Sequence, residues 1–318
     1  MKVLHITNNF PTESNPVFGI FVKEQIESLT NLGIENEVFF INGRETGKWA
    51  YSKSIIRLRK LLKAKRFDII HCHHSLSATC FILSGFSYGQ NSIVSYQSDP
   101  SNELGGHLYH FIKSNIKFAI LKNNSPLVNN SMIFNQPNGV NVNFFKPIEK
   151  EICFSKVKLD AHKRYILFVS SNFNRPEKRY DRFKEVLEIL KNKYSLDDIE
   201  ELILINTERK LVSFYLNASS LHLLTSDFEG SPNSVKEAMA CNISVVSTNV
   251  GNVSELLSGC IGSYVAKTKN PEELAELSYK VLTNADPINS RTILIEKELD
   301  LESVAKKIVS IYEKVIKK

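Results

Sequence analysis

Two glutamates, Glu229 and Glu237, stand eight positions apart on either side of a turn that reads Gly-Ser-Pro-Asn. An apolar run at 221–224 precedes them, and a helical pattern begins after the turn. Carboxylates accept hydrogen bonds from ligand hydroxyls, and Gly230 allows the backbone to bend sharply or to approach a ligand closely. Glu229 comes directly before the turn and Glu237 falls in the second helical turn, so both are expected to face one polar ligand.

The helix that follows this turn is expected to begin with an anion site. Ser231 is a good N-cap, and Pro232 suits the first helical position. The backbone N–H groups of Asn233 and Ser234 would then point outward, where the helix dipole helps them to bind a phosphate. Hydroxyl acceptors beside a phosphate site suit a sugar nucleotide. The alternative is an ordinary helix-capping turn with solvated glutamates.

The composition is that of a globular protein long enough for two domains. The chain has 318 residues, of which 42% are hydrophobic and 23% are charged, and this length is natural for two domains. The net charge of +6 suits an anionic partner without requiring one. The five cysteines include no CxxC pair, which favours reduced thiols in a cytosol. We predict no signal peptide and no segment near the ~20 apolar residues of a membrane span.

Short apolar runs alternate with helical patterns along both halves of the chain, and turn formers interrupt the alternation near residues 136–139. In the first half, strands are predicted at 2–7, 36–41, 68–73, 92–96 and 126–130, and helices at 18–32, 54–64, 76–86 and 104–121. In the second half, strands are predicted at 164–170, 201–206, 221–225 and 243–247, with helices at 178–193, 210–218, 231–240, 252–257 and from 271 onward.

This alternation predicts right-handed βαβ units and parallel sheets covered by helices on both faces. The expected class is therefore α/β, with two Rossmann-like doubly wound domains at 1–145 and 146–300. The remaining helix, 301–318, is expected to pack back on the N-terminal domain. Ligands of such sheets bind outside the carboxyl ends of the strands, so two facing domains would share a ligand in the cleft between them.

Three motifs together resemble one family, the GT-B retaining glycosyltransferases of family 4. Residues 229–240 read E-G-S-P-N-S-V-K-E-A-M-A and resemble that family's E-G-x-P-x-x-x-x-E-A-M-A signature. Residues 138–147, N-G-V-N-V-N-F-F-K-P, are similar to its N-G-V-D-x-x-x-F-x-P junction between domains. Residues 168–179 are similar to its strand–loop–helix segment that carries an arginine and a lysine. Residues 10–25 look like the first-strand loop of many bacterial surface-polysaccharide members, and 68–71 and 247–256 match weaker patterns.

The resemblance implies the GT-B fold and transfer of a sugar, with retention, from a UDP- or GDP-sugar without an obligatory metal or other cofactor. Glu229 would lie beside the donor sugar ring, and Glu237 would accept hydrogen bonds from ribose hydroxyls. The turn would bind sugar and phosphate through the backbone of Gly230, Ser231, Pro232 and Asn233. Gly19 would lie near the phosphates from the other domain, unless it is a plain turn residue.

Arg175 and Lys178 are the candidates for stabilising the leaving nucleoside diphosphate. Arginine binds two phosphate oxygens at once, and lysine acts as a compact point charge. Many members of the family have Gly-Arg where this chain has Ser171 and Asn172, so Arg175 is expected to replace that arginine from a shifted position. A solvated basic turn is the alternative.

On the acceptor side, the chain departs from the family. Many members carry a histidine after the fourth strand, but here Tyr96 or Gln97 occupies its place. Asp99, three residues after Tyr96, is expected to orient the acceptor. Without that histidine, the resemblance does not carry a histidine contact to the donor sugar's hydroxyls over to this chain.

The run from His71 to His74, with Cys72 between, resembles a metal site in composition only. On a strand, His71 and His73 point to one face, and no further carboxylate or cysteine pair completes a recognisable ligand set. We therefore expect no metal, and we expect His71 to be a strand-end residue that faces the cleft.

Residues 53–66 form a basic amphipathic pattern, with apolar residues on one face and lysines and arginines on the rest. Such a helix can lie on anionic lipid, although it can also be a domain helix with a solvated outer face. The expected protein is cytoplasmic and peripheral on the inner face of the membrane. It would transfer sugar to a glycan or polyprenyl-linked acceptor for capsule, O-antigen or a teichuronic-type polymer.

Two other functions are the alternatives on this fold class. A non-catalytic subunit that binds a nucleotide sugar or a glycan on the same fold is the main alternative, because the acceptor-side histidine and the Gly-Arg pair are altered. A nicotinamide dehydrogenase would need a G-x-G-x-x-G turn after a strand, which the chain lacks. Nucleic acid is not an expected partner, because the basic residues are not interleaved with exposed aromatics.

Overall fold

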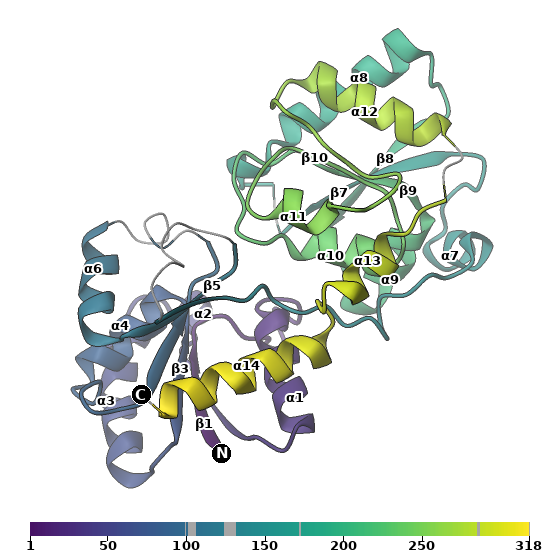
Figure 1. The fold of residues 1–318 in the computed structure, drawn as a ribbon. Coiled ribbons are helices and arrows are strands. Elements are labelled where there is room, and N and C mark those ends of the chain that lie inside the picture. Colours follow the sequence, from purple (N-terminus) through teal and green to yellow (C-terminus); the bar gives the residue numbers. More distant parts are fainter. Residues whose placement is uncertain (99, 101–105, 124–131, 172, 285–286, 318) are drawn as a thin grey trace. The chain divides into compact units, whose positions relative to one another are not determined.

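The computed structural model describes residues 1–98, 100, 106–123, 132–171, 173–284 and 287–317. The chain divides into two compact units (Figure 1). Residues 1–139 and 301–318 form the N-terminal unit, and residues 140–300 form the C-terminal unit. Each unit contains one parallel sheet with helices packed on it, so the predicted α/β class with two doubly wound halves is confirmed.

The sheet of the N-terminal unit has six strands in the order β2-β1-β3-β4-β5-β6, and all neighbouring strands are parallel. Its strands are β1 (Lys2–Thr7), β2 (Glu35–Phe40), β3 (Ile69–His73), β4 (Ser92–Ser95), β5 (Phe118–Leu121) and β6 (Ile133–Asn135). The helices are α1 (Ile20–Asn31), α2 (Gly43–Thr46), α3 (Trp49–Ala64), α4 (Ser75–Leu83), α6 (Gly106–Asn115) and α14 (Leu301–Ile316).

Apolar residues on alternate positions of these strands serve two different cores. Leu4 and Ile6 belong to the core under α3, α4 and α6, whereas Val3 faces the core formed with α1 and α14. Burial on both faces is the rule for parallel sheets. In Figure 1, α14 lies alongside α1 on the N-terminal unit, although the two helices come from opposite ends of the sequence.

One predicted element of the N-terminal unit is wrong. The helix expected over 104–121 ends at Asn115, and the run Phe118–Leu121 is instead strand β5. A short apolar run has no periodicity that separates a buried strand from a helical turn; here β4 and β6 pair with it on either side. Strand β6 was not predicted, and the strand expected at 126–130 lies outside the described residues.

The sheet of the C-terminal unit has five parallel strands in the order β11-β10-β9-β7-β8. They are β7 (Arg164–Ser170), β8 (Ile199–Ile205), β9 (Ser219–Leu224), β10 (Val245–Ser247) and β11 (Tyr264–Val265). The α-helices are α7 (Lys150–Val157), α8 (Tyr180–Tyr194), α9 (Arg209–Ala218), α10 (Asn233–Ala240), α11 (Val253–Leu257), α12 (Pro271–Thr283) and α13 (Ser290–Glu296). A 3₁₀ turn, Pro176–Lys178, precedes α8.

The boundary between the units lies at Gly139–Val140 rather than near residue 145. Val140 donates its backbone N–H to Leu299 O (2.9 Å) and forms a parallel bridge with Asp300. These contacts hold residues 140 onward in the C-terminal unit, where the sequence offered only a turn signal. Within the described parts of the chain, no helix combines the length and apolar character needed to cross a membrane.

Candidate functional site

The loop between β9 and α10 carries the carboxylate of Glu229 into contact with a cation from another segment. Lys178 Nζ lies 2.5 Å from Glu229 Oε1, and Ser226 Oγ donates to the same oxygen at 2.9 Å. Both charged side chains are largely buried, at 11% exposed for Lys178 and 14% for Glu229. The two residues stand 51 positions apart, and their pairing follows from the sheet. Strands β7 and β9 are parallel neighbours, so the loops at their carboxyl ends meet at one end of the sheet.

Arg175 has a different partner from Lys178, although the two are three positions apart. Its Nε donates to Glu177 Oε1 at 2.6 Å, and its side chain is 39% exposed. Burial raises the pKa of Glu177. A backbone hydrogen bond and the Arg175 guanidinium together lower it by more, so the pKa is below its ordinary value. Asn172, one of the two residues that replace the family's Gly-Arg, lies outside the described residues.

The start of α10 differs from the prediction by two residues. The N-cap is Pro232, whose backbone is extended (φ −66°, ψ 119°), and the helix begins at Asn233. The Ser231 hydroxyl does not cap the helix; it accepts a hydrogen bond from Lys236 Nζ at 3.2 Å. The N-cap expectation for Ser231 is therefore wrong, because a buried lysine takes the hydroxyl. The first N–H groups of α10 still mark a positive helix end.

Gly230 is held by a second loop that follows β10. Asn252 donates its N–H to Gly230 O at 3.1 Å, and Gly251 has a φ of 55°. A Cβ on Gly251 would lie 2.2 Å from Gly230 O, so only glycine fits there without displacing the Glu229 turn. The sequence contained this signal as the weak family pattern at 247–256, but no role was predicted for Gly251.

Glu237 is paired with an arginine that sequence reasoning missed. Arg209 Nη1 donates to Glu237 Oε1 at 2.8 Å, and the side chains are 22% and 13% exposed. Arg209 is the first residue of α9 and follows the carboxyl end of β8. Its place shortly after a strand was the one available signal, because parallel strands deliver such residues to the same end of the sheet.

Three further polar residues surround this turn. Lys236 is fully buried, and Asn252 is 3% exposed. Within the described chain, Asn233 Oδ1 and Asn252 Oδ1 are buried acceptors that have no hydrogen-bond partner. A buried acceptor without a partner is costly, and ligand hydroxyls would satisfy both oxygens. The turn therefore offers carboxylates and amide oxygens to hydroxyls, and cations and a helix end to an anion.

The predicted site residues of the N-terminal unit differ in where they lie: one caps a helix, one is in the core and one is at a strand end. Gly19 caps α1 with a φ of 69°, and a Cβ there would lie 2.3 Å from the carbonyl carbon of Asn9, so close backbone packing alone requires glycine. Tyr96 is 1% exposed within the core, which favours Gln97 as the contact at this strand end. Gln97 Oε1 accepts a hydrogen bond from Asn138 Nδ2 at 3.1 Å. Asp99 lies outside the described residues.

His71 is a core residue, so the expectation that it faces a cleft is wrong. It is fully buried, and its two ring nitrogens contact Tyr312 Oη (2.6 Å) and Ser95 Oγ (2.7 Å). His5 Nδ1 lies 3.0 Å from His73 Nε2, and His5 Nε2 lies 2.8 Å from Asn36 Oδ1. The cause is the period-2 alternation, which puts His5, His71 and His73 on the face of the sheet that packs against α14.

Burial keeps these three histidines neutral. It lowers the pKa of His5 to about 4, and it lowers the pKa values of His71 and His73 well below their usual range. The ligand nitrogens of the cluster all lie within 4.8 Å of one another. A metal would have to displace the hydrogen bonds to Tyr312, Ser95 and Asn36, and the cluster therefore fits a polar core contact.

Comparison with known proteins finds a family model that matches one segment of the C-terminal unit. Residues 188–284 match the family model described as glycosyl transferases group 1, and this range includes Arg209, Glu229 and Glu237. We call residues 188–284 the group 1 segment, after the family model that they match. A probable sucrose-phosphate synthase of Thermosipho melanesiensis is 30% identical over 206 residues, which cover 57% of this chain and 47% of that protein. The chain thus spans about half the length of the curated relative that it matches.

Solved structures extend the likeness in fold beyond the group 1 segment. Sucrose-phosphate synthase from Thermosynechococcus elongatus superposes with a TM-score of 0.75 at 16% identity, covering 99% of this chain and 98% of that one. A glycosyltransferase from Rickettsia africae gives 0.73 at 16% identity, with 100% and 99% covered. Anabaena HepE, solved with UDP-glucose, gives 0.71 at 13% identity, with 99% and 100% covered. These likenesses show the GT-B fold.

Proposed function

We propose that this protein is a retaining glycosyltransferase that moves a sugar from a nucleotide-sugar donor to an acceptor hydroxyl. The observation that carries the proposal is the Lys178–Glu229 contact (2.5 Å), which lies in the loops after β7 and β9 and close in sequence to the start of α10. The group 1 segment supports the reaction class. HepE, a protein of similar fold, was solved in complex with UDP-glucose, and this supports a UDP-sugar as the donor class.

In this reaction the bond between the anomeric carbon and the diphosphate oxygen breaks, and the acceptor oxygen forms a bond on the same face of the sugar. The electron pair leaves with the nucleoside diphosphate, and the acceptor's proton is released. Lys178 is proposed to stabilise the charge that develops on the leaving diphosphate, with Arg175 as a second, more exposed cation. Electrostatic stabilisation of this kind is usually the largest catalytic contribution.

The carboxylates are proposed to orient the donor. Glu229 would accept hydrogen bonds from the sugar, and Glu237, oriented by Arg209, would accept them from ribose. Gly230, Ser231 and Asn233 would contribute backbone groups at the phosphate end. Because Lys178 and Arg175 already supply positive charge, no metal is assigned to the site, and no further cofactor is part of the proposal.

The acceptor is proposed to be a glycan or a polyprenyl-linked sugar of a cell-surface polysaccharide, reached by peripheral contact with an anionic membrane. Helix α3 supports this. Leu58 and Leu62 are buried against the sheet, whereas Trp49 and Ile56 are exposed among lysines and arginines. Exposed aromatic and aliphatic groups beside basic residues are typical of helices that lie on anionic lipid. Sedimentation with vesicles containing anionic lipid, compared with neutral vesicles, tests this contact.

Thermal-shift measurements with UDP-, GDP-, ADP- and CDP-sugars test the donor site. A donor at 100 times its Kd should stabilise the protein by about 2.7 kcal/mol. Glu229→Gln should reduce that stabilisation, whereas Glu200→Gln, at a partly exposed position at the start of β8, should leave it unchanged. No stabilisation by any donor would contradict the proposal. Donor binding without release of nucleoside diphosphate, with acceptor present, would instead favour a non-catalytic binding subunit.

A further inference from the structure

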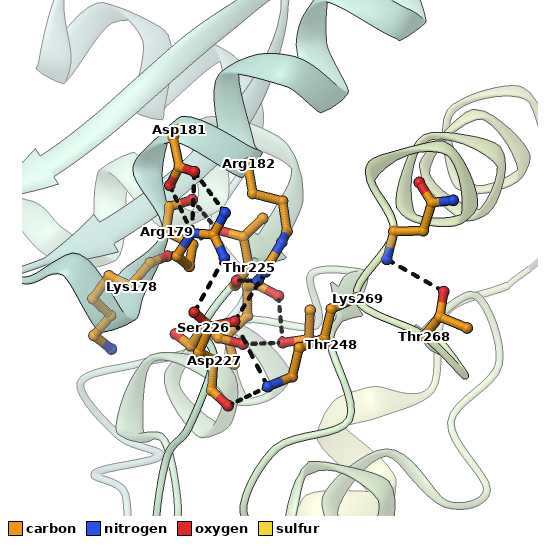
Figure 2. Close-up of polar contacts among 12 residues, drawn as sticks. Lys178, Arg179, Asp181, Arg182, Thr225, Ser226, Asp227, Thr248, Thr268 and Lys269 are labelled. Carbon is orange, nitrogen blue, oxygen red and sulfur yellow. Dashed lines mark hydrogen bonds and ion pairs between the residues drawn. The ribbon is translucent and has the colours of Figure 1, made fainter.

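Asp227 lies at the centre of a polar network two residues before Glu229 (Figure 2). Its carboxylate accepts hydrogen bonds from Arg182 Nη2 (2.9 Å) and Arg179 Nη1 (3.2 Å), and Lys269 Nζ lies 3.6 Å from Oδ1. Its backbone is held at both ends: the N–H donates to Glu177 O (2.7 Å), and the carbonyl accepts from Lys269 Nζ (2.6 Å). One residue therefore joins the turn after β7, the loop after β9 and the loop after β11.

Arg179, directly after Lys178, has a backbone conformation that favours glycine. Its φ of 53° and ψ of 56° are left-handed, a region that a residue with a Cβ enters at a cost. The guanidinium is held from two sides, with Asp181 at 2.7–3.1 Å and Asp227 at 3.2 Å. Figure 2 shows Arg179 between these two carboxylates. These contacts stabilise the strained turn from which Lys178 projects.

The same network fixes both partners of the Lys178–Glu229 pair. Thr225 Oγ1 donates to the carbonyls of Lys178 and Arg179, each at 3.0 Å. Arg182 Nη1 donates to Thr225 O at 2.5 Å. The arginine that binds Asp227 therefore also holds the threonine that contacts the Lys178 backbone. On the other side, Thr248 Oγ1 donates to Ser226 O (2.7 Å), and Ser226 Oγ donates to Glu229.

We infer that Asp227 and Arg179 are positioning residues, which set the distance between Lys178 and Glu229 by tying together the loops that carry them. The inference rests on the proposed function for its kinetic consequence. Asp227 also offsets the charge of Arg179, Arg182 and Lys269. Removing its charge should therefore misplace Lys178 while leaving more positive charge near the donor's phosphates.

The first test needs no donor. The coupling free energy between Lys178→Met and Glu229→Gln, from a double-mutant cycle on unfolding, should fall by about half or more in an Asp227→Asn background. The matched control is Asp198→Asn in the same unit, because Asp198 also binds an arginine side chain, Arg164, at 2.5 Å. It lies directly before β8, at the amino ends of the strands, whereas the Lys178 and Glu229 loops follow their carboxyl ends. Equal coupling in both backgrounds would overturn the inference.

The second test is kinetic. Asp227→Asn should lower kcat by roughly 10- to 100-fold, as expected for a small misplacement, while the donor KM stays equal or falls because positive charge is added. Arg179→Gly should lower kcat with little loss of Tm, since glycine accepts the left-handed turn, and Arg179→Lys should restore part of the rate. A loss of Tm with unchanged kcat would show a merely structural role and overturn the inference. If the coupling falls but the wild type transfers no sugar, the positioning stands and the proposed function fails.

Discussion

One polar cluster in each unit can be compared, and the two are buried in opposite ways. In the N-terminal unit, His5, His71 and His73 lie deep in the sheet, neutral and hydrogen-bonded to partners in the core. In the C-terminal unit, Lys178 and Glu229 form a largely buried ion pair that is carried by loops. Histidines are common catalytic residues, but the three in the first cluster are buried in a core.

The difference lies in where each cluster sits on its sheet. The histidines are within the strands, where both faces are covered, so their side chains can reach only other core groups. The ion pair is beyond the carboxyl ends of the strands, where open α/β sheets bind ligands. Position along a strand therefore separates core polar residues from candidate ligand-binding ones better than residue type does.

Lys178→Ala should have the largest effect on kcat. A small effect would contradict the contrast between the ion pair and the core histidines. We expect kcat to fall by roughly 10²–10³-fold, the typical loss when one preorganised group is removed from a developing charge. The measurement is the rate of nucleoside diphosphate release at saturating donor. Lys184→Ala, an exposed lysine on α8 beside Glu201, is the control and should keep the wild-type rate. Equal rates for all three proteins would remove Lys178 from the site.

The second largest effect should come from acidification, which should lower the free energy of unfolding through the histidine cluster. The folded pKa of His5 is about 4 against an ordinary value of 6.5, so between these values the unfolded state binds more protons. Stability is then fully present above pH 6.5 and falls as the pH drops toward 4. From pH 6.5 to 5, His5 alone should cost about 2 kcal/mol. Denaturant unfolding at several pH values measures this, and a flat profile would contradict the neutral cluster.

His71→Phe should destabilise the N-terminal unit by roughly 1–3 kcal/mol, because Tyr312 Oη and Ser95 Oγ would lose their buried partner. Per folded molecule, kcat should remain unchanged. The matched substitution His110→Phe, at an exposed position of α6, should leave the unfolding free energy nearly unchanged. A drop in kcat without loss of stability would instead move His71 from the core group to the functional group.

Arg175→Ala should have the smallest effect. Arg175 is 39% exposed and already paired with Glu177, so we expect kcat to fall only about tenfold, equivalent to roughly 1.4 kcal/mol. Comparing its kcat with that of Lys178→Ala ranks the two cations directly. An Arg175 loss equal to that of Lys178 would mean that burial does not set the order.

The sequence was sufficient for the parts of the molecule that local pattern decides. Strands β1 and β7 have the predicted bounds, and the turn at Glu229 was found from its neighbours along the chain. Three of the failures share a different cause, since each depends on pairing between distant segments. Phe118–Leu121 became a strand because β4 and β6 accept it. Arg209 reaches Glu237 across 28 positions, and His71 meets Tyr312 across 241.

Residues 301–318 carry a consequence for how this protein is made. They complete the N-terminal unit, because Tyr312 and Ile308 fill the core under the histidine face, yet they are translated after all of residues 140–300. During synthesis the C-terminal unit can finish folding first, although its neighbour begins to emerge earlier, which reverses the usual order of domain folding. Until α14 docks, the nascent chain exposes the histidine face.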